Sequence, residues 1–398
     1  MSRPDLLQRL ALRIAGRERA GLLRHLRAVE QARDARVVVT GRELLNFSSN
    51  DYLGLARHPE VIAALREAAN EHGVGATAAH LICGHHREHA ALEEELADWT
   101  GRERVLLFSS GWLANLGALQ ALLDRDGVGV QDKLNHASLL DAGKLAGCTL
   151  KRYRHADAEG ASRQLKTADG TPALLATDGV FSMDGDIAPL RELATLCARE
   201  GAVLMVDDAH GMGVLGAHGE GSVAEAGLSQ GEVPVLMATL GKALGCTGAF
   251  VAGSAALIEG LTQFARTYVY TTALPPALAA AARAAVRIAH NENWRREKLH
   301  SLIARFRRGA LQIGLPLAES RTAIQPVLLG DVEATMRAAA DLEDAGLLVG
   351  AIRPPAVPAG SARLRITFSA AHEEADVDRL LDALARVVPH PSKAASSL

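Results

Sequence analysis

Short apolar runs alternate with longer segments of helical spacing between about residues 45 and 285. Four of these runs have the length of strands and end beside polar residues: 105–110, 173–177, 202–206 and 234–238. Continuous apolar runs of this kind are typical of parallel strands buried on both faces of a sheet. The segments between them are long enough for crossover helices, so the pattern predicts an α/β fold with a mostly parallel, doubly wound sheet. Residues 250–253 follow Gly248 too closely for a crossover and are expected to form an antiparallel neighbour.

The N-terminal part has a different pattern. Leucine and isoleucine recur at roughly helical spacing through residues 1–35, which predicts an amphipathic helix. Seven arginines lie between Arg13 and Arg36 and outnumber the acidic residues there. This excess of positive charge is compatible with a solvated helix face. A docking surface for an acidic substrate such as coenzyme A or an acyl carrier protein is the alternative.

After two prolines at 275 and 276 the pattern changes again, and a helical stretch is expected over 277–312. Shorter elements follow, with strands expected at 323–330, 347–352 and 363–368 and helices at 333–345 and 374–387. The last eight residues are expected to be frayed. These patterns divide the chain into an N-terminal helical segment (1–45), a large domain (46–285) and a smaller α+β C-terminal domain (286–398).

The composition is that of an ordinary globular protein. The chain has 398 residues, 48% of them hydrophobic and 22% charged. Its net charge of −3 gives no indication of nucleic-acid binding. The four cysteines are far apart and form no Cys-x-x-Cys pair, which favours reduced thiols. We find neither the apolar core of a secretory signal nor a run long enough to span a bilayer, so we expect a cytoplasmic protein without a membrane partner.

Two of the predicted strands end in reactive side chains. Asp207 directly follows the run 202–206, and Lys242 lies shortly after the run 234–238. Each alone has an ordinary explanation, as a helix cap or a surface lysine. Open α/β sheets bind ligands beyond the carboxyl ends of their strands, however, and a desolvated lysine forms a Schiff base. A buried carboxylate needs a cationic partner such as a protonated pyridine nitrogen. The pair therefore predicts a site for pyridoxal 5′-phosphate (PLP), with His210 near the ring oxygen or the imine.

Other residues complete this candidate site. Residues 109–111 begin a predicted helix, whose backbone amides would cradle a phosphate, and Thr239 adds a hydroxyl group. His136 lies at the start of another predicted helix, where it would stack on a planar cofactor or simply cap the helix. Ser182 follows a strand and is placed to hydrogen-bond the cofactor.

Two further features allow more than one interpretation. Five histidines occur within residues 72–89, and His85 and His89 would share a helix face. The order lacks the His-Glu-x-x-His pattern, and no cysteine or carboxylate set completes a ligand shell, so we expect no metal. Arg353 precedes two prolines that hold the chain extended. It would make a fork for a substrate carboxylate or, alternatively, a surface salt bridge.

These residues together resemble the α-oxoamine synthases, which are PLP-dependent enzymes of fold type I. The resemblance runs from about residue 20 to 388 and rests on motifs in family order: NFSSNDYLGL (46–55), FSSGWLAN (108–115), NHASLLDA (135–142), DGVFSMDGD (178–186), VDDAHGMGVLG (206–216), TLGKALG (239–245) and RPPAVPAGSARLRIT (353–367). The resemblance implies a transferase fold with a mostly parallel sheet in the large domain.

The resemblance also implies a role for each matching residue. Lys242 would form the Schiff base, Asp207 would hold the pyridine nitrogen and His136 would stack on the ring. The other implied cofactor contacts are Gly111, Trp112, Ser182, His210 and Thr239, with Thr271 or Thr272 reaching the cofactor of a partner subunit in a homodimer. Arg24 would meet the acyl substrate, Asn50 and Arg353 the amino-acid carboxylate, and Ala356 stands where a substrate-contacting threonine is expected.

Within the family, the motifs at 46–55 and 353–367 are most similar to those of the member that joins L-alanine to a pimeloyl thioester in biotin synthesis. The sequence does not decide whether the acyl group is carried by coenzyme A or by an acyl carrier protein. The alternatives are a 2-amino-3-ketobutyrate coenzyme A ligase-like enzyme using glycine, a non-catalytic binding module and a histidine metal protein. The loop at 75–80, Asp178 and Ala356 depart from the family pattern and leave the details of substrate contact open.

Overall fold

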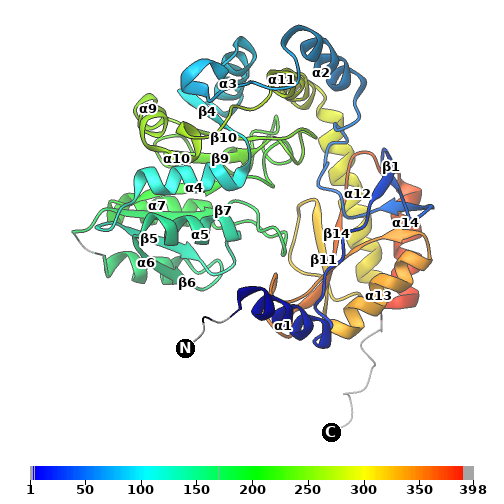
Figure 1. Cartoon of the computed structure of the whole chain (residues 1–398). Helices are drawn as coiled ribbons and strands as arrows, with labels where there is room; N and C mark the ends of the chain where they lie inside the picture. The colour runs from blue at the N-terminus through cyan, green and yellow to red at the C-terminus, as the bar shows by residue number, and fades with distance from the viewer. Residues whose placement is uncertain (1–2, 4, 169, 389–398) are drawn as a thin grey trace.

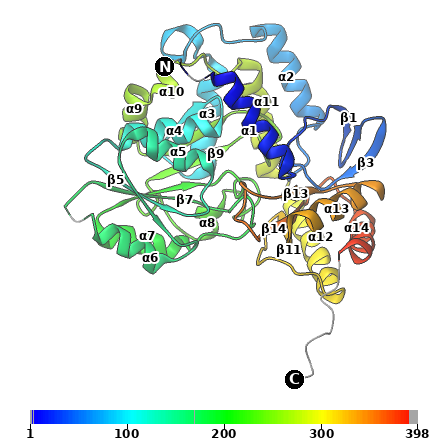
Figure 2. The same cartoon turned by 60° about the horizontal axis from the view of Figure 1, so that its bottom comes forward.

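The computed structural model describes residues 3, 5–168 and 170–388 (Figure 1). The expectation for the last eight residues therefore lies outside the described part of the chain. A large α/β body lies beside a smaller body built from the two ends of the chain (Figures 1 and 2). None of the helices in the described ranges combines the length and the apolar content needed to cross a bilayer.

The central sheet of the large body has the strand order β4-β10-β9-β8-β7-β5-β6. Its strands are β4 (Arg104–Phe108), β5 (Val128–Asp132), β6 (Thr149–Tyr153), β7 (Ala173–Asp178), β8 (Val203–Asp207), β9 (Val235–Thr239) and β10 (Ala249–Gly253). The pairs β6/β5, β5/β7, β7/β8 and β8/β9 are parallel, whereas β10 is antiparallel to both β9 and β4. The mostly parallel sheet and its antiparallel strand at 250–253 are thus confirmed.

Helices cover both faces of this sheet. Successive side chains of its apolar strands point to opposite sides, so each face of the sheet presents an apolar surface that a layer of helices buries. Val105 and Leu107 belong to one buried cluster, while Leu106 and Phe108 belong to the other. The first face is covered by α3 (Arg87–Thr100), α6 (Ala158–Lys166), α7 (Leu190–Glu200) and α11 (Pro276–Asn291). The second is covered by α4 (Gly111–Leu122), α5 (Ala137–Ala146), α9 (Ala255–Phe264) and α10 (Arg266–Val269). The remaining helical elements of this body are α2 (Pro59–His72), which packs against α11, the π-helical turn η1 (His80–Gly84) and the short α8 (Ser222–Glu225).

The smaller body joins N-terminal and C-terminal elements. One sheet has the order β11-β14-β13 and the other the order β1-β2-β3-β12. Their strands are β1 (Val29–Arg33), β2 (Arg36–Val39), β3 (Arg42–Asn46), β11 (Ile324–Gly330), β12 (Leu347–Leu348), β13 (Gly350–Ile352) and β14 (Ala362–Thr367). The helices are α12 (Asn293–Gln312), α13 (Val332–Asp344) and α14 (Glu374–Val387). The C-terminal strands and helices expected from the sequence are present; where the domains divide stays a prediction.

Three expectations need correction. The N-terminal helix α1 (Leu6–Arg19) ends well before residue 35, because Gly21 takes a positive φ of 65° and β1 and β2 then form a hairpin around Asp34. The stretch 277–312 is two helices interrupted at Glu292. The run 347–352 is split, since β12 pairs with β3 and β13 pairs with β14 in the other sheet.

Candidate active site

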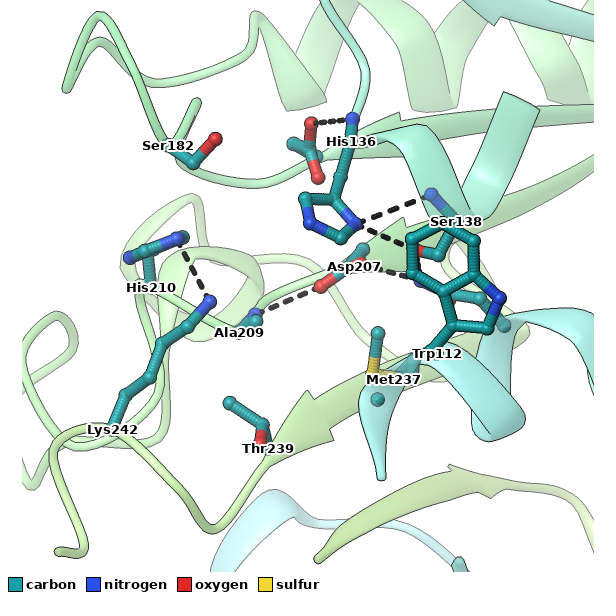
Figure 3. Close-up of a pocket in the computed structure, with 13 residues that line it drawn as sticks. Trp112, His136, Ser138, Ser182, Asp207, Ala209, His210, Met237, Thr239 and Lys242 are labelled. Carbon is teal, nitrogen blue, oxygen red and sulfur yellow. Dashed lines mark hydrogen bonds between the residues drawn. The ribbon is translucent and has the colours of Figure 1, made fainter. Parts of the chain in front are cut away.

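A cavity of about 200 Å³ lies where β7, β8 and β9 end and α4 and α5 begin (Figure 3). Eight residues proposed from the sequence line it: Gly111, Trp112, His136, Ser182, Asp207, His210, Thr239 and Lys242. Parallel strands deliver their carboxyl ends to one edge of a sheet, which is why residues so distant in the sequence meet here. The remaining lining residues are Asn115, Ser138, Asp178, Ala209 and Met237.

The Lys242 amine lies at one side of the cavity and begins a hydrogen-bonded chain. Its Nζ is 2.8 Å from Nε2 of His210, and Nδ1 of that histidine is 2.7 Å from the Tyr52 hydroxyl. Burial lowers the pKa of Lys242 to about 8, against the opposing effect of the Asp207 and Asp178 carboxylates. Burial also lowers the pKa of His210 well below its usual value, and the charge on Lys242 acts in the same direction. The site therefore holds a neutral imidazole beside an amine that loses its proton more easily than a solvent-exposed lysine.

The buried Asp207 carboxylate lies across the cavity and is held by two donors. Its Oδ2 accepts a 2.7 Å bond from the Asn115 amide, and its Oδ1 accepts a 3.1 Å bond from the Ala209 backbone N–H. The same Asn115 nitrogen also donates to Ser138 Oγ at 2.8 Å. Asn115 thus uses both amide hydrogens to fix the carboxylate and the serine in one orientation.

His136 forms one wall of the cavity as the N-cap of α5. Its Nδ1 accepts a 3.3 Å bond from the Ser138 backbone N–H and lies 2.7 Å from the Ser138 hydroxyl. Burial lowers the pKa of His136, so the ring is neutral, and with Nδ1 accepting, Nε2 carries the proton. Its backbone N–H donates to Asp178, whose pKa is raised well above its usual range by burial and by Asp207.

The far end of the cavity is suited to an anion. Helix α4 starts at Gly111, so its first backbone N–H groups have no partner within the helix and face the cavity with the positive end of the helix dipole. The Thr239 side chain lies beside them, where its hydroxyl accepts from the Gly241 N–H and donates to the Gly248 carbonyl. One cavity is thus lined by the Lys242 amine, the buried Asp207 carboxylate, the His136 ring and the anion site at the start of α4. This set of groups fits PLP, which has an aldehyde, a pyridine nitrogen, a flat ring and a phosphate.

Asn50 is paired with an arginine other than the one the sequence indicated. Its Oδ1 lies 3.4 Å from both terminal nitrogens of the buried Arg365, whose Nε donates to the Ser182 carbonyl at 2.6 Å. Arg353 instead donates to the Leu23 carbonyl at 3.0 Å and contacts the Met336 sulfur. The structure therefore brings Asn50 together with Arg365 and places Arg353 against the N-terminal segment.

The other proposed substrate and interface residues lie outside this cavity. Arg24 is exposed, Thr271 is half-buried and Thr272 is exposed next to Ser109, whose hydroxyl donates to the Thr272 carbonyl at 3.5 Å. Ala356 lines a neighbouring cavity that shares His136 and Ser182 with the first one. The roles expected for these residues stay predictions.

Sequence reasoning missed Asn115, Tyr52 and Arg365. Asn115 has a local signal, because it lies one helical turn beyond Gly111 on the helix that begins at the cavity. Tyr52 and Arg365 lie inside motifs that were recognised, but no spacing rule brings together residues about 300 positions apart.

The structure brings several of the histidines of residues 72–89 together, as the i, i+4 spacing of His85 and His89 suggested. Ligand atoms of His80, His85 and His89 lie within 4.8 Å of one another. Both ring nitrogens of His89 are already engaged, one accepting from the His86 N–H at 2.9 Å and the other 2.6 Å from the Leu274 carbonyl. Coordination by His89 would break one of these bonds; the absence of a metal stays a prediction.

The fold and this site define a PLP-dependent enzyme of fold type I. The family model for aminotransferases of class I and II matches residues 42–384. An 8-amino-7-oxononanoate synthase from Thioalkalivibrio sulfidiphilus is 58% identical over 93% of this chain and 95% of its own length. One from Hahella chejuensis is 54% identical over 94% of this chain and 95% of its own. The chain belongs to the 8-amino-7-oxononanoate synthase family.

Solved structures agree with this assignment. Serine palmitoyltransferase from Sphingomonas wittichii superimposes with a TM-score of 0.92 at 32% identity, covering 96% of this chain and 98% of that one. A serine palmitoyltransferase from S. paucimobilis, solved with a PLP–myriocin adduct, gives 0.92 at 30% identity over 96% of this chain and 98% of its own. An 8-amino-7-oxononanoate synthase from Francisella tularensis gives 0.76 at 29% identity, covering 86% and 97%. The expected fold class, family and cofactor are confirmed.

Proposed function

We propose that this protein catalyses the decarboxylative condensation of L-alanine with a pimeloyl thioester, which gives 8-amino-7-oxononanoate, carbon dioxide and the free thiol in biotin synthesis. The observation that carries this proposal is the amine of Lys242, with a pKa lowered to about 8, in the same small cavity as the buried Asp207 carboxylate. PLP, when bound, supplies an electron sink for the carbanion formed at the substrate α-carbon.

The chain's own residues have separate tasks in this reaction. Lys242 would hold the cofactor, and its Nζ would remove the α-proton of alanine. Asp207, oriented by Asn115, keeps the pyridine nitrogen protonated. His136 would lie against the cofactor ring and offer its Nε2 proton to the reacting carbonyl group. His210 and Ser182 would bind the ring oxygen, and Gly111, Trp112 and Thr239 would hold the phosphate.

We propose that the alanine carboxylate binds to Asn50 and Arg365. The Arg365 guanidinium is buried beside the cavity, and its nearest polar contacts are the neutral Asn50 amide and the Ser182 carbonyl. A buried guanidinium favours a carboxylate, which it binds as a fork. Arg353, held by the Leu23 carbonyl, would then position the segment that carries Arg24 toward the acyl substrate.

We also propose that the working unit is a homodimer. Several large apolar side chains are exposed: Trp112, which lines the cavity, at 43%, Tyr270 at 73% and Phe264 at 68%. Exposed large apolar side chains are enriched at protein interfaces. In such a dimer, Thr271 or Thr272 would reach the cofactor of the partner subunit. Cytoplasmic localisation stays a prediction from the sequence.

The visible spectrum of the purified holoenzyme tests the proposal, together with the release of thiol and carbon dioxide. The cofactor band should shift on addition of L-alanine, and thiol should be released when pimeloyl-coenzyme A follows. A band that responds to glycine and not to alanine would favour the glycine-using ligase reaction. The Lys242→Ala variant is the control and should show neither the band nor turnover.

A further inference from the structure

A second cavity, of about 510 Å³, adjoins the PLP site; we call it the side groove. The two cavities share His136 and Ser182, so the side groove begins where the acyl group would react. It is walled by the start of α5, the loop after β7 and the segment 355–358. A chain attached at the reacting carbon would therefore have a direct path into this groove.

Much of the wall of the side groove is apolar. Leu134 and Leu140 contribute from one side, and Met183 and Val357 from the loops opposite. Aliphatic walls of this kind favour a chain of methylene groups, each of which gains roughly 0.8 kcal/mol on full burial. They offer little to the nucleotide of coenzyme A, which is polar and highly charged.

Two cations, Lys133 and Arg152, also line the groove. Lys133 directly follows β5 and Arg152 lies in β6, and these parallel strands are paired side by side. The Arg152 guanidinium donates to the Lys133 carbonyl, and the Lys133 N–H donates to the Tyr153 carbonyl at 3.1 Å, which holds the two residues together. The pairing of the strands therefore fixes both positive charges at the same end of the sheet.

These two charges are not neutralised within the described part of the chain, where neither makes an ion pair. The one carboxylate among the residues that line the groove, Asp184, is engaged by Arg363. A groove with aliphatic walls and two unneutralised cations is complementary to an aliphatic chain that ends in a carboxylate.

We propose that the side groove binds the acyl chain of the thioester, and that Lys133 and Arg152 bind the free carboxylate at its far end. The inference rests on the proposed function and adds the residues that select a dicarboxylic acyl group. A monocarboxylic chain of the same length would fill the apolar walls and leave both cations without a partner.

The test compares pimeloyl-coenzyme A with heptanoyl-coenzyme A, which has the same carbon count and lacks only the distal carboxylate. Thiol release by the holoenzyme gives kcat/KM for both thioesters in the wild type, Lys133→Gln, Arg152→Gln and the double variant. Each single variant should lose about tenfold in kcat/KM for the pimeloyl thioester, mainly through KM, because a hydrogen bond between charged groups is lost. The value for the heptanoyl thioester should stay within about twofold, since it never used these cations.

Two control variants separate the groove from general charge effects. Lys133→Arg keeps the positive charge and should keep the preference for the pimeloyl thioester. Lys144→Gln removes an exposed cation elsewhere on α5 and should leave both values unchanged. Equal losses for the two thioesters would show that the cations bind the carrier's phosphates. Wild-type values for both thioesters in the double variant would show that the cations bind neither substrate. Either result overturns the proposal.

A binding measurement keeps this inference separate from the proposed function. Free pimelate should bind the holoenzyme more tightly than heptanoate by calorimetry, and the difference should disappear in the double variant. If the wild type turned over neither thioester with alanine, the proposed function would fail, while the pimelate measurement would still decide on the groove. Equal binding of pimelate and heptanoate by the wild type would reject the role of the groove.

Discussion

Lys242 is the residue at which burial matters most for the chemistry. Its amine has a pKa lowered to about 8, mainly by burial, and hydrogen-bonds to a histidine whose own pKa is lowered. A neutral imidazole accepts a hydrogen bond from the ammonium without adding a second positive charge. The arrangement makes the free amine, which is the nucleophilic form, accessible near neutral pH.

This lowered pKa gives a pH prediction for cofactor uptake. When PLP is added to the apoenzyme, the rate at which the visible band forms should rise with pH around a midpoint of about 8, because only the unprotonated amine reacts. An ordinary lysine would give a midpoint about two units higher, near ~10.4. Stopped-flow absorbance between pH 6.5 and 9.5 measures this, with Lys242→Ala as the control that forms no band. A rate still rising steeply at pH 9.5 would contradict the role of burial.

Asn115 provides a second prediction at the scale of single residues. The Asn115→Leu variant should lower kcat by about tenfold or more, since Asp207 loses the donor that orients it and a hydrogen bond to a charged group is lost. PLP binding should weaken less, because the phosphate contacts are unchanged. Gln120→Leu removes an exposed amide from the same helix and should have no effect. Steady-state kinetics measures kcat, and PLP titration measures cofactor binding. Equal kcat values for the two variants would show that the Asn115 amide does not contribute to catalysis.

Prediction of site residues from sequence worked where the signal was local. Asp207 and Lys242 each follow an apolar run, and the carboxyl end of a parallel strand is where such groups act. Arg365 gave no such signal, because its place in the site depends on its contact with Asn50, which is 315 positions away in the sequence. A contact between distant segments arises only when the chain folds, so a single sequence does not reveal it.

The same contrast holds at the scale of elements. Strands buried on both faces, such as β8 and β9, were found from their continuous apolar runs. Strand β6 was missed because it is half-exposed and largely polar, and β5 because its five residues include a glycine and two polar side chains. The hairpin of β1 and β2 was mistaken for helix, since β1 is exposed throughout and buries no side chain that would set a strand period.

The two missed strands carry a clamp that positions the Ser182 loop. His155, just after β6, lies 3.2 Å from Asp132 at the end of β5 and 2.8 Å from Asp186 in the loop after β7. Burial lowers the pKa of His155, but the hydrogen bonds to both carboxylates outweigh it and raise this pKa to about 10. The charged imidazole therefore ties the loop to the sheet edge.

A stability prediction follows from this clamp. His155→Gln should lower the free energy of unfolding by roughly 1–3 kcal/mol, since it leaves partly buried carboxylates without their cation. Because the folded pKa is raised, the stabilisation is complete below the unfolded pKa of about 6.5 and is lost as pH rises toward 10. The difference in Tm between wild type and variant should therefore shrink from pH 6 to pH 10. His218→Gln, at an exposed histidine, is the control, and a Tm difference that does not vary with pH would contradict a charged clamp.

At the scale of the whole molecule, the PLP site lies close to surface that a single chain leaves uncovered. Trp112 lines the cavity and is itself partly exposed, and Tyr270 is exposed beside Thr271 and Thr272. Helix α1 buries no side chain and exposes leucines along its length. Apolar surface next to the site supports the proposal that a second copy of the chain completes it.

A complementation experiment tests whether two chains share each site. Lys242→Ala and Thr272→Trp should each be inactive alone, the first for want of the amine and the second because a large side chain would block the partner's cofactor site. Mixing them under subunit exchange should recover up to about a quarter of wild-type activity, since half of the dimers would be hybrids with one intact site. Chromatography with light scattering establishes that each variant remains dimeric and folded. Full activity of Thr272→Trp alone, or no recovery in verified hybrids, would place this residue outside the partner's site.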